Sequence, residues 1–130
     1  MTDIEPTPPE ELFSVISKVL QPVCGDNVFE GYVPESVDPK ATSNNNYAIY
    51  NLSSGNFNTV SNKFVFNSSP QFDIQVYLDK DYDKTYDVLN NLCRSLINDE
   101  WSIDQSDIYN NDLIDKEHVE ILIQVSKSFY

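Results

Sequence analysis

Hydrophobic residues along this chain follow two spacings, and the changes between them predict the order of helices and strands. Between Leu12 and Leu20 apolar residues recur every three or four positions, the spacing of a helix with one buried face. Proline fits the first turn of a helix and disrupts its interior, so Pro8 suits the start and Pro22 the end. The pattern predicts a helix from about Pro8 to Leu20, with residues 1–6 as a flexible tail.

Two strand patterns and two polar stretches follow this first helix. Residues 28–34 and 47–52 are rich in aromatic and β-branched residues, which favours strands. Residues 35–46 contain Pro39 and a run of asparagines, a composition typical of a loop. Residues 53–69 are rich in Asn and Ser. We expect them to form a long loop or hairpin arm that projects from the domain, and a connection of this length is often functional.

The second half of the chain repeats the change of spacing. Residues 72–78 alternate strictly between apolar and polar, which predicts a strand with one buried face. Apolar residues at helical spacing predict a second helix within 82–97: Tyr82, Tyr86, Leu89, Leu92, Cys93, Leu96 and Ile97. Strands are expected at 101–108 and 118–125, with a turn at 110–112 between them.

Helix-capping signals mark the start of both helices. Thr7 is placed to cap the first helix and Glu10 to complete a capping box. Asp81 or Asp83 is placed to cap the second. The element order predicts a single α+β domain over residues 1–130, a mainly antiparallel sheet of four to five strands with two helices packed on one face.

The charge of the chain narrows the classes of partner. Twenty-one Asp and Glu residues stand against eight Lys and Arg, a formal net charge of −13. Such a charge repels phosphate and argues against ordinary nucleic-acid binding. Three roles for the acidic residues remain: they keep the protein soluble, they form a surface for basic partners, or they form a wall along which DNA slides. No apolar run is long enough to span a membrane, so we expect no membrane among the partners of this protein.

Motifs for catalysis or cofactor binding are not found. The run from Asp79 to Asp83 suggests a calcium loop, but Lys84 and Asn90 stand where the loop needs Gly and Glu. One His and two separated Cys residues make structural zinc improbable, and three glycines cannot build a phosphate-binding loop. We therefore expect no enzyme activity, no metal and no cofactor.

Tyrosines and phenylalanines are the residues that suggest a binding role. Tyrosine suits interfaces because it buries an apolar ring while its hydroxyl stays wet, although a β-rich core would use the same residues. Tyr77 is the strongest candidate, since it falls on the polar face of its strand. Apolar residues in the arm join it as expected subunit or partner contacts: Phe57, Val60, Phe64 and Phe66.

The order of these features resembles the tail terminator, or tail completion, proteins of tailed bacteriophages. The resemblance rests on the first helix, the stretch Val28–Pro34, the strand Tyr47–Tyr50, the polar arm, and the strand and helix from Phe72 to Ile97. It covers nearly the whole chain through the order and spacing of the motifs.

The resemblance implies a non-catalytic virion protein, assembled in the host cytoplasm and located at the tail and neck. Such proteins form a ring, typically a hexamer, that caps the tail tube, stops its polymerisation and joins it to the neck or head-completion protein. DNA passes through the pore without specific binding. Four carboxylates are expected to line such a pore: Asp73, Asp79, Asp81 and Asp83.

Two other functions fit the same sequence. A small acidic protein can mimic DNA and inhibit a nucleic-acid enzyme by occupying its basic groove. A head-completion protein of the phage neck would share some partners with a tail terminator but would not contact the end of the tube.

Overall fold

Five strands and three helices make up the parts of the chain that the computed structural model describes, residues 7–54, 70–110 and 116–128. The helices are α1 (Pro8–Cys24), α2 (Pro39–Thr42) and α3 (Thr85–Asn98). The strands are β1 (Val28–Glu30), β2 (Tyr47–Ser54), β3 (Gln71–Asp79), β4 (Ser102–Tyr109) and β5 (His118–Ser126).

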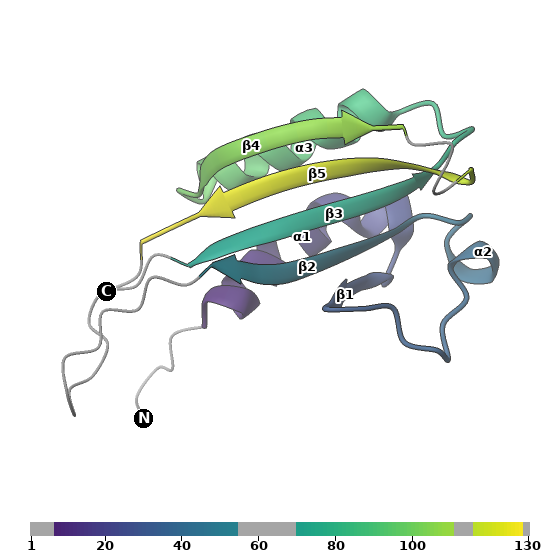
Figure 1. Ribbon diagram of the computed structural model, residues 1–130, viewed down its shortest axis with the longest axis horizontal. Coiled ribbons are helices and arrows are strands. Elements are labelled where there is room, and N and C mark those ends of the chain that lie inside the picture. Colours follow the sequence, from purple (N-terminus) through teal and green to yellow (C-terminus); the bar gives the residue numbers. More distant parts are fainter. Residues whose placement is uncertain (1–6, 55–69, 111–115, 129–130) are drawn as a thin grey trace.

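The strands form one sheet in the order β1-β2-β3-β5-β4 (Figure 1). Neighbouring strands are antiparallel except for β1 and β2, which are parallel. The α+β class and the mainly antiparallel five-stranded sheet are confirmed. The sheet is mixed, because the chain between β1 and β2 returns through α2 before it adds the second strand alongside the first.

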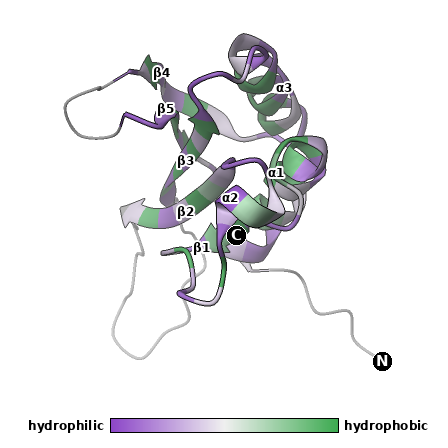
Figure 2. Ribbon diagram, turned by 90° about the vertical axis from the view of Figure 1, so that its right-hand side faces the viewer, coloured by the Kyte–Doolittle hydropathy of each residue, from purple (hydrophilic) through white to green (hydrophobic). Residues whose placement is uncertain are grey.

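Helices α1 and α3 pack side by side on one face of the sheet, as the sequence predicts (Figure 2). Alternate residues of β3 and β5 point toward them and are fully buried, which is the burial that strict alternation favours. The largest buried side chains of the core come from these two strands and the two helices: Leu12, Ile16, Leu20, Phe72, Ile74, Leu78, Leu92, Leu96, Ile121 and Ile123.

Helix α1 continues one turn beyond the predicted end at Leu20. Pro22 lies inside its last turn, and the helix closes where the Gly25 N–H donates to the Gln21 carbonyl at 3.0 Å. A proline so near the end removes only one backbone hydrogen bond, so the helix tolerates it. Thr7 is the N-cap residue, but its side chain makes no capping hydrogen bond. The predicted capping box was wrong in this respect.

Helix α3 begins later than predicted, and neither Asp81 nor Asp83 caps it. Its N-cap residue is Lys84, which makes no side-chain capping bond. Two residues assigned to the apolar stripe, Tyr86 and Ile97, are 74% and 59% exposed. The buried row is Val88, Leu92 and Leu96, at i, i+4 and i+8, and it faces the sheet and α1. Leu92 and Leu96 are confirmed members of the predicted stripe, and Val88 was missed.

The stretch expected to be only a loop, residues 35–46, contains α2. Asp38 caps this short helix by accepting the Lys40 N–H at 3.1 Å, and Pro39 occupies its first position. A capping residue followed by proline, here Asp38-Pro39, is the same kind of start signal as Thr7-Pro8 in α1, so the sequence did carry evidence for it. The run of asparagines, with Pro39 taken as a loop residue, outweighed that signal in the prediction.

Strand ends shift by a few residues from the prediction. β1 stops at Glu30 because Gly31 adopts a φ of +88° and turns the chain away from β2. β2 extends through Ser53 and Ser54, which were assigned to the arm. Residues 1–6 and 55–69, the predicted tail and most of the predicted arm, lie outside the described residues, as do two of the three residues of the turn at 110–112.

Candidate functional site

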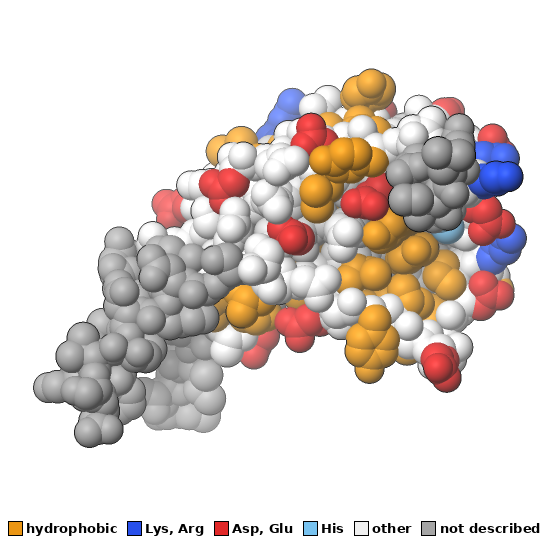
Figure 3. Space-filling model, in the orientation of Figure 1, with side chains coloured by type: hydrophobic (Ala, Val, Ile, Leu, Met, Phe, Trp, Pro, Cys, Tyr) orange, Lys and Arg blue, Asp and Glu red, His pale blue; other side chains and the backbone are white. Residues whose placement is uncertain are grey.

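The face of the sheet opposite α1 and α3 carries no helix in the described parts of the chain, and we call it the open face. Its side chains come from the positions that alternate with the buried core, so they are half-buried or exposed. Figure 3 looks onto this face, where hydrophobic side chains gather over β1, β2 and β3 and acidic side chains are scattered around them. A sheet face that mixes apolar and acidic groups is a candidate binding surface.

An aromatic cluster of Tyr47, Tyr77 and His118 lies at one end of the open face. Tyr47 and Tyr77 are paired across β2 and β3, and their rings stack with centroids 4.8 Å apart and planes inclined by 20°. The His118 ring meets both edge-on, at 5.4 Å from Tyr47 and 6.1 Å from Tyr77. Stacked and edge-to-face pairs are the favourable arrangements of aromatic rings, so the three residues stabilise one another.

His118 is held in one orientation by the loop before β2. Its Nε2 lies 2.9 Å from the carbonyl oxygen of Asn45. A carbonyl oxygen only accepts, so Nε2 carries a proton and donates it. His118 therefore links the aromatic cluster to the asparagine-rich loop.

A second row of the open face continues the apolar surface. Phe29 pairs with Ile49, and Ile49 pairs in turn with Gln75, which lies opposite Leu122. Phe29, Ile49 and Leu122 are all half-buried. With the aromatic cluster they form a patch that crosses β1, β2, β3 and β5, and we call it the apolar patch.

Carboxylates surround the apolar patch without basic neighbours on the strands. No Lys or Arg occurs in any of the five described strands. Glu120 and Asp107 lie beside the patch, and each accepts a hydrogen bond from an open-face side chain, Glu120 from Gln75 at 3.4 Å and Asp107 from Tyr109 at 3.3 Å. The potential over this face is therefore negative, and it favours a partner that is neutral or basic.

Asp73 is the carboxylate whose hydrogen bonding is incomplete. It lies in the middle of β3 on the open face, between Asn51 of β2 and Gln124 of β5. Its Oδ1 is buried and has no hydrogen-bond partner in the described structure. A buried oxygen without a donor costs free energy, so a donor brought by a partner would be bound favourably.

The four carboxylates expected to line a pore do not come together. Asp73 is six strand residues from Asp79, a separation of about 20 Å. Asp79 accepts the backbone N–H of Asp81 and the side-chain amide of Asn45, both at 3.1 Å. Both hydrogen bonds lower the pKa of Asp79, and the bond from Asn45 has the larger effect. Asp81 and Asp83 are exposed in the turn before α3.

Among the expected contact residues, Tyr77 lies in the aromatic cluster. Phe57, Val60, Phe64 and Phe66 lie outside the described residues, and their role stays a prediction. Sequence reasoning missed the rest of the apolar patch: Phe29, Tyr47, Ile49, His118 and Leu122. It also missed the hydrogen bond that links His118 to the loop before β2. Each strand's alternation was visible, but the register that pairs Tyr47 with Tyr77 is a property of two strands together.

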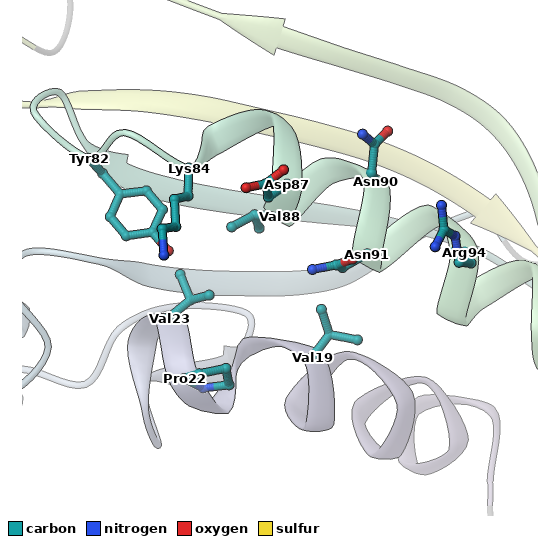
Figure 4. Close-up of a pocket in the computed structure, with 10 residues that line it drawn as sticks. All are labelled: Val19, Pro22, Val23, Tyr82, Lys84, Asp87, Val88, Asn90, Asn91 and Arg94. Carbon is teal, nitrogen blue, oxygen red and sulfur yellow. The ribbon is translucent and has the colours of Figure 1, made fainter.

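A second surface feature is a groove between α1 and α3, with a volume of about 550 Å³ (Figure 4). Val19, Pro22 and Val23 line it from α1, whereas α3 contributes Asp87 and Arg94 among other polar groups. Its apolar side chains belong to the contact between the two helices. No nucleophile paired with a base is among its lining residues, so the open face is the stronger candidate site.

Neither cysteine sits where its thiol would be activated. Cys24 is 1% exposed, and burial raises its pKa to about 12. Burial also raises the pKa of the half-buried Cys93. Both thiols therefore stay protonated near neutral pH. Within the described ranges no three His, Cys, Asp or Glu residues are grouped to hold a metal ion, and no helix is long and apolar enough to cross a membrane.

Comparison with known proteins adds no family assignment. No protein-family model matches the sequence, and the search of curated proteins gave no match. The class that the structure defines is a mixed five-stranded α+β domain with two helices on one face and an acidic, aromatic open face.

Proposed function

We propose that this protein is a tail terminator of a tailed bacteriophage, a structural virion protein that forms a ring on the end of the tail tube. The observation that carries the proposal is the open face, an apolar patch surrounded by carboxylates on a sheet whose other face is covered by two helices. A surface of this kind supports binding to other proteins rather than catalysis. The order of the two long helices and five strands, to which the fold adds the short α2, supports the same resemblance.

The ring would cap the tube, stop its growth and join it to the neck. A closed ring needs two different patches on each copy, one of which meets the other on the next copy. The open face supplies one candidate patch, which includes Tyr77 in its aromatic cluster. A hexamer is the state that the resemblance implies.

The pore of such a ring would let DNA pass without holding it. Carboxylates repel phosphates and release no counterions, so DNA gains nothing by stopping there. Asp81 and Asp83 are the best candidates for the pore wall because both are exposed in one turn, next to Asp79. Asp73 lies on the open face instead, and we assign it to the protein interface.

An early stop codon in the gene, placed in the phage genome that encodes it, tests the proposal. Electron micrographs of the lysate should show filled heads separate from tails, with tubes of uncontrolled length. Normal virions would overturn the proposal and leave the inhibitor of a nucleic-acid enzyme as the better explanation. Tails of normal length beside heads that have lost their DNA would also overturn it, in favour of a head-completion protein.

A further inference from the structure

The open face is poorly suited to pair with the same face of another copy. Asp73, Asp107 and Glu120 lie on it, and its strands carry no Lys or Arg in the part of the chain that the structure describes. Two such faces brought together would oppose like charges around their apolar patches, which costs free energy. The partner of this face is therefore a surface or segment that lacks acidic residues.

One stretch of this chain has that property. No Asp or Glu occurs from Pro39 to Phe72, although the whole chain has a net charge of −13. The stretch contains two basic residues, Lys40 and Lys63. Within it, residues 55–69 combine Lys63 with three phenylalanines and two valines. Their composition complements an apolar patch surrounded by carboxylates.

We propose that the open face binds residues 55–69 of a second copy of this chain. The phenylalanines of the segment would cover the apolar patch, and Lys63 would lie among the surrounding carboxylates. The buried Oδ1 of Asp73, which has no partner among the described residues, is placed to accept a hydrogen bond from Lys63 or from a side-chain amide of the segment.

At the aromatic cluster, the part of the patch farthest from where the segment joins the sheet, the geometry of β2 and β3 favours a neighbour's segment over the copy's own. The segment leaves and re-enters the sheet at Ser54 and Gln71, whereas the aromatic cluster lies at the other end of these strands. From Gln71 to Tyr77 is about 20 Å along β3. The five residues from Phe66 to Gln71 span at most about 18 Å, and the chain would have to reverse direction as well. Phe57, three residues from Ser54, falls shorter still.

This contact would be heterologous, since a segment on one copy meets a sheet face on the next. A repeated head-to-tail contact closes into a ring when its rotation allows. The inference deepens the proposed function, because it names the two patches that such a ring needs. Only the closure of the ring depends on the proposed function. The binding of the segment to the open face is argued from the carboxylates and the apolar patch of that face.

Cysteine cross-linking between separate copies tests the contact directly. One full-length protein carries Phe64→Cys and the other carries Leu122→Cys on the open face, both with Cys93→Ser; the native Cys24 is buried. Mixing the two under a mild oxidant should give a mixed disulfide dimer. The control replaces Leu122→Cys with Asn90→Cys, an exposed position on α3, and should give several-fold less. Equal yields with both would overturn the proposal.

Two further variants keep the test decisive. If Leu122→Cys does not fold, Gln75→Cys offers the adjacent position on β3. A single chain carrying both Phe64→Cys and Leu122→Cys distinguishes the two sources of the segment. A disulfide within one chain, with no mixed dimers at any concentration, would show that the copy's own segment occupies the face, and would overturn the proposal.

Charge substitutions supply the second readout. Lys63→Glu should weaken self-association about 2- to 5-fold, the effect of one exposed ion pair, and Lys63→Arg should preserve it. Unchanged association for Lys63→Glu would contradict the role assigned to the lysine. The mass of the cross-linked assembly separates this proposal from the proposed function. Closed rings would support both proposals. Open chains of cross-linked copies would support the contact between segment and open face but contradict the ring.

Discussion

Asn46 joins the loop before β2 to the end of β3, because its side-chain Oδ1 accepts the backbone N–H of Asp79 at 2.8 Å. The same side chain donates through Nδ2 to the Val23 carbonyl in the last turn of α1, at 3.1 Å. Asn46 is 3% exposed. One buried amide therefore links a helix, a loop and a strand at the end of the sheet where the aromatic cluster lies.

Asn46→Ala should lower the free energy of unfolding by about 2–3 kcal/mol. The substitution leaves the N–H of Asp79 and the carbonyl of Val23 without partners, and each buried unsatisfied group costs about 1–3 kcal/mol. Urea unfolding followed by circular dichroism measures the change. Asn90→Ala, an exposed position on α3, is the matched control and should cost nothing, because alanine has the higher helix propensity. Equal losses in both variants would contradict the structural role of Asn46.

Two neighbouring residues of α3 give a sharper test of the fold, because one lies in the core and the other lies on the surface. Leu96 is 0% exposed and Ile97 is 59% exposed. Leu96→Ala should lower the free energy of unfolding by about 2–5 kcal/mol, the cost of a buried leucine together with the cavity it leaves. Ile97→Ala should change it by about 0.5 kcal/mol or less. Thermal and urea unfolding of the two variants check this directly. A large loss of stability for Ile97→Ala would show that the buried face of α3 is assigned wrongly.

Ile97 also shows what the sequence could and could not predict about the fold. The strict alternation of β3 predicted its buried face correctly, because a strand has only two faces and one was wholly apolar. A helix offers a continuous range of directions, so an apolar stripe that included Tyr86 and Ile97 looked as plausible as the true one through Val88. Contacts with α1 and the sheet decide between them, and those are tertiary.

The candidate site was predictable to the same partial extent. Tyr77 was identified because it breaks the polar side of its own strand. Its stacking on Tyr47 depends on the register of β2 against β3, and its contact with His118 depends on the pairing of β3 with β5. The parallel pairing of β1, which brings Phe29 into the apolar patch, depends on the path of the chain through α2. Periodicity within one segment carries none of this information.

Glu100 occupies a backbone conformation that usually belongs to glycine. Its φ is +68°, just after α3, where the Trp101 N–H donates to the Leu96 carbonyl at 2.9 Å. Glu100→Gly should raise the free energy of unfolding by about 0.5–1 kcal/mol, because glycine relieves the left-handed strain by more than it adds entropy to the unfolded chain. Asp83→Gly is the control, at a turn residue without positive φ, and should destabilise. The prediction fails if both variants lose stability equally in urea unfolding.

Acid should destabilise the protein in part through Asp79. Hydrogen bonds from Asn45, then from the N–H of Asp81, lower the pKa of this carboxyl below its ordinary value. In the folded state Asp79 therefore releases its proton more readily than in the unfolded chain. Its contribution to stability is fully present well above the unfolded pKa of about 3.9, and it is lost as the pH falls toward and through the lower folded pKa.

Asp79→Asn removes the titrating group, and its single amide oxygen can accept one of the two hydrogen bonds. Between about pH 5 and pH 2 its unfolding free energy should fall less steeply than that of the native protein. Asn45→Gly is the matched variant: it removes the amide donor, and glycine tolerates the φ of +71° at this position. It should raise the pKa of Asp79 in a carboxyl NMR titration and reduce the acid slope in the same direction. An acid slope that is unchanged in both variants would mean that the Asn45–Asp79 bond does not couple protonation to folding.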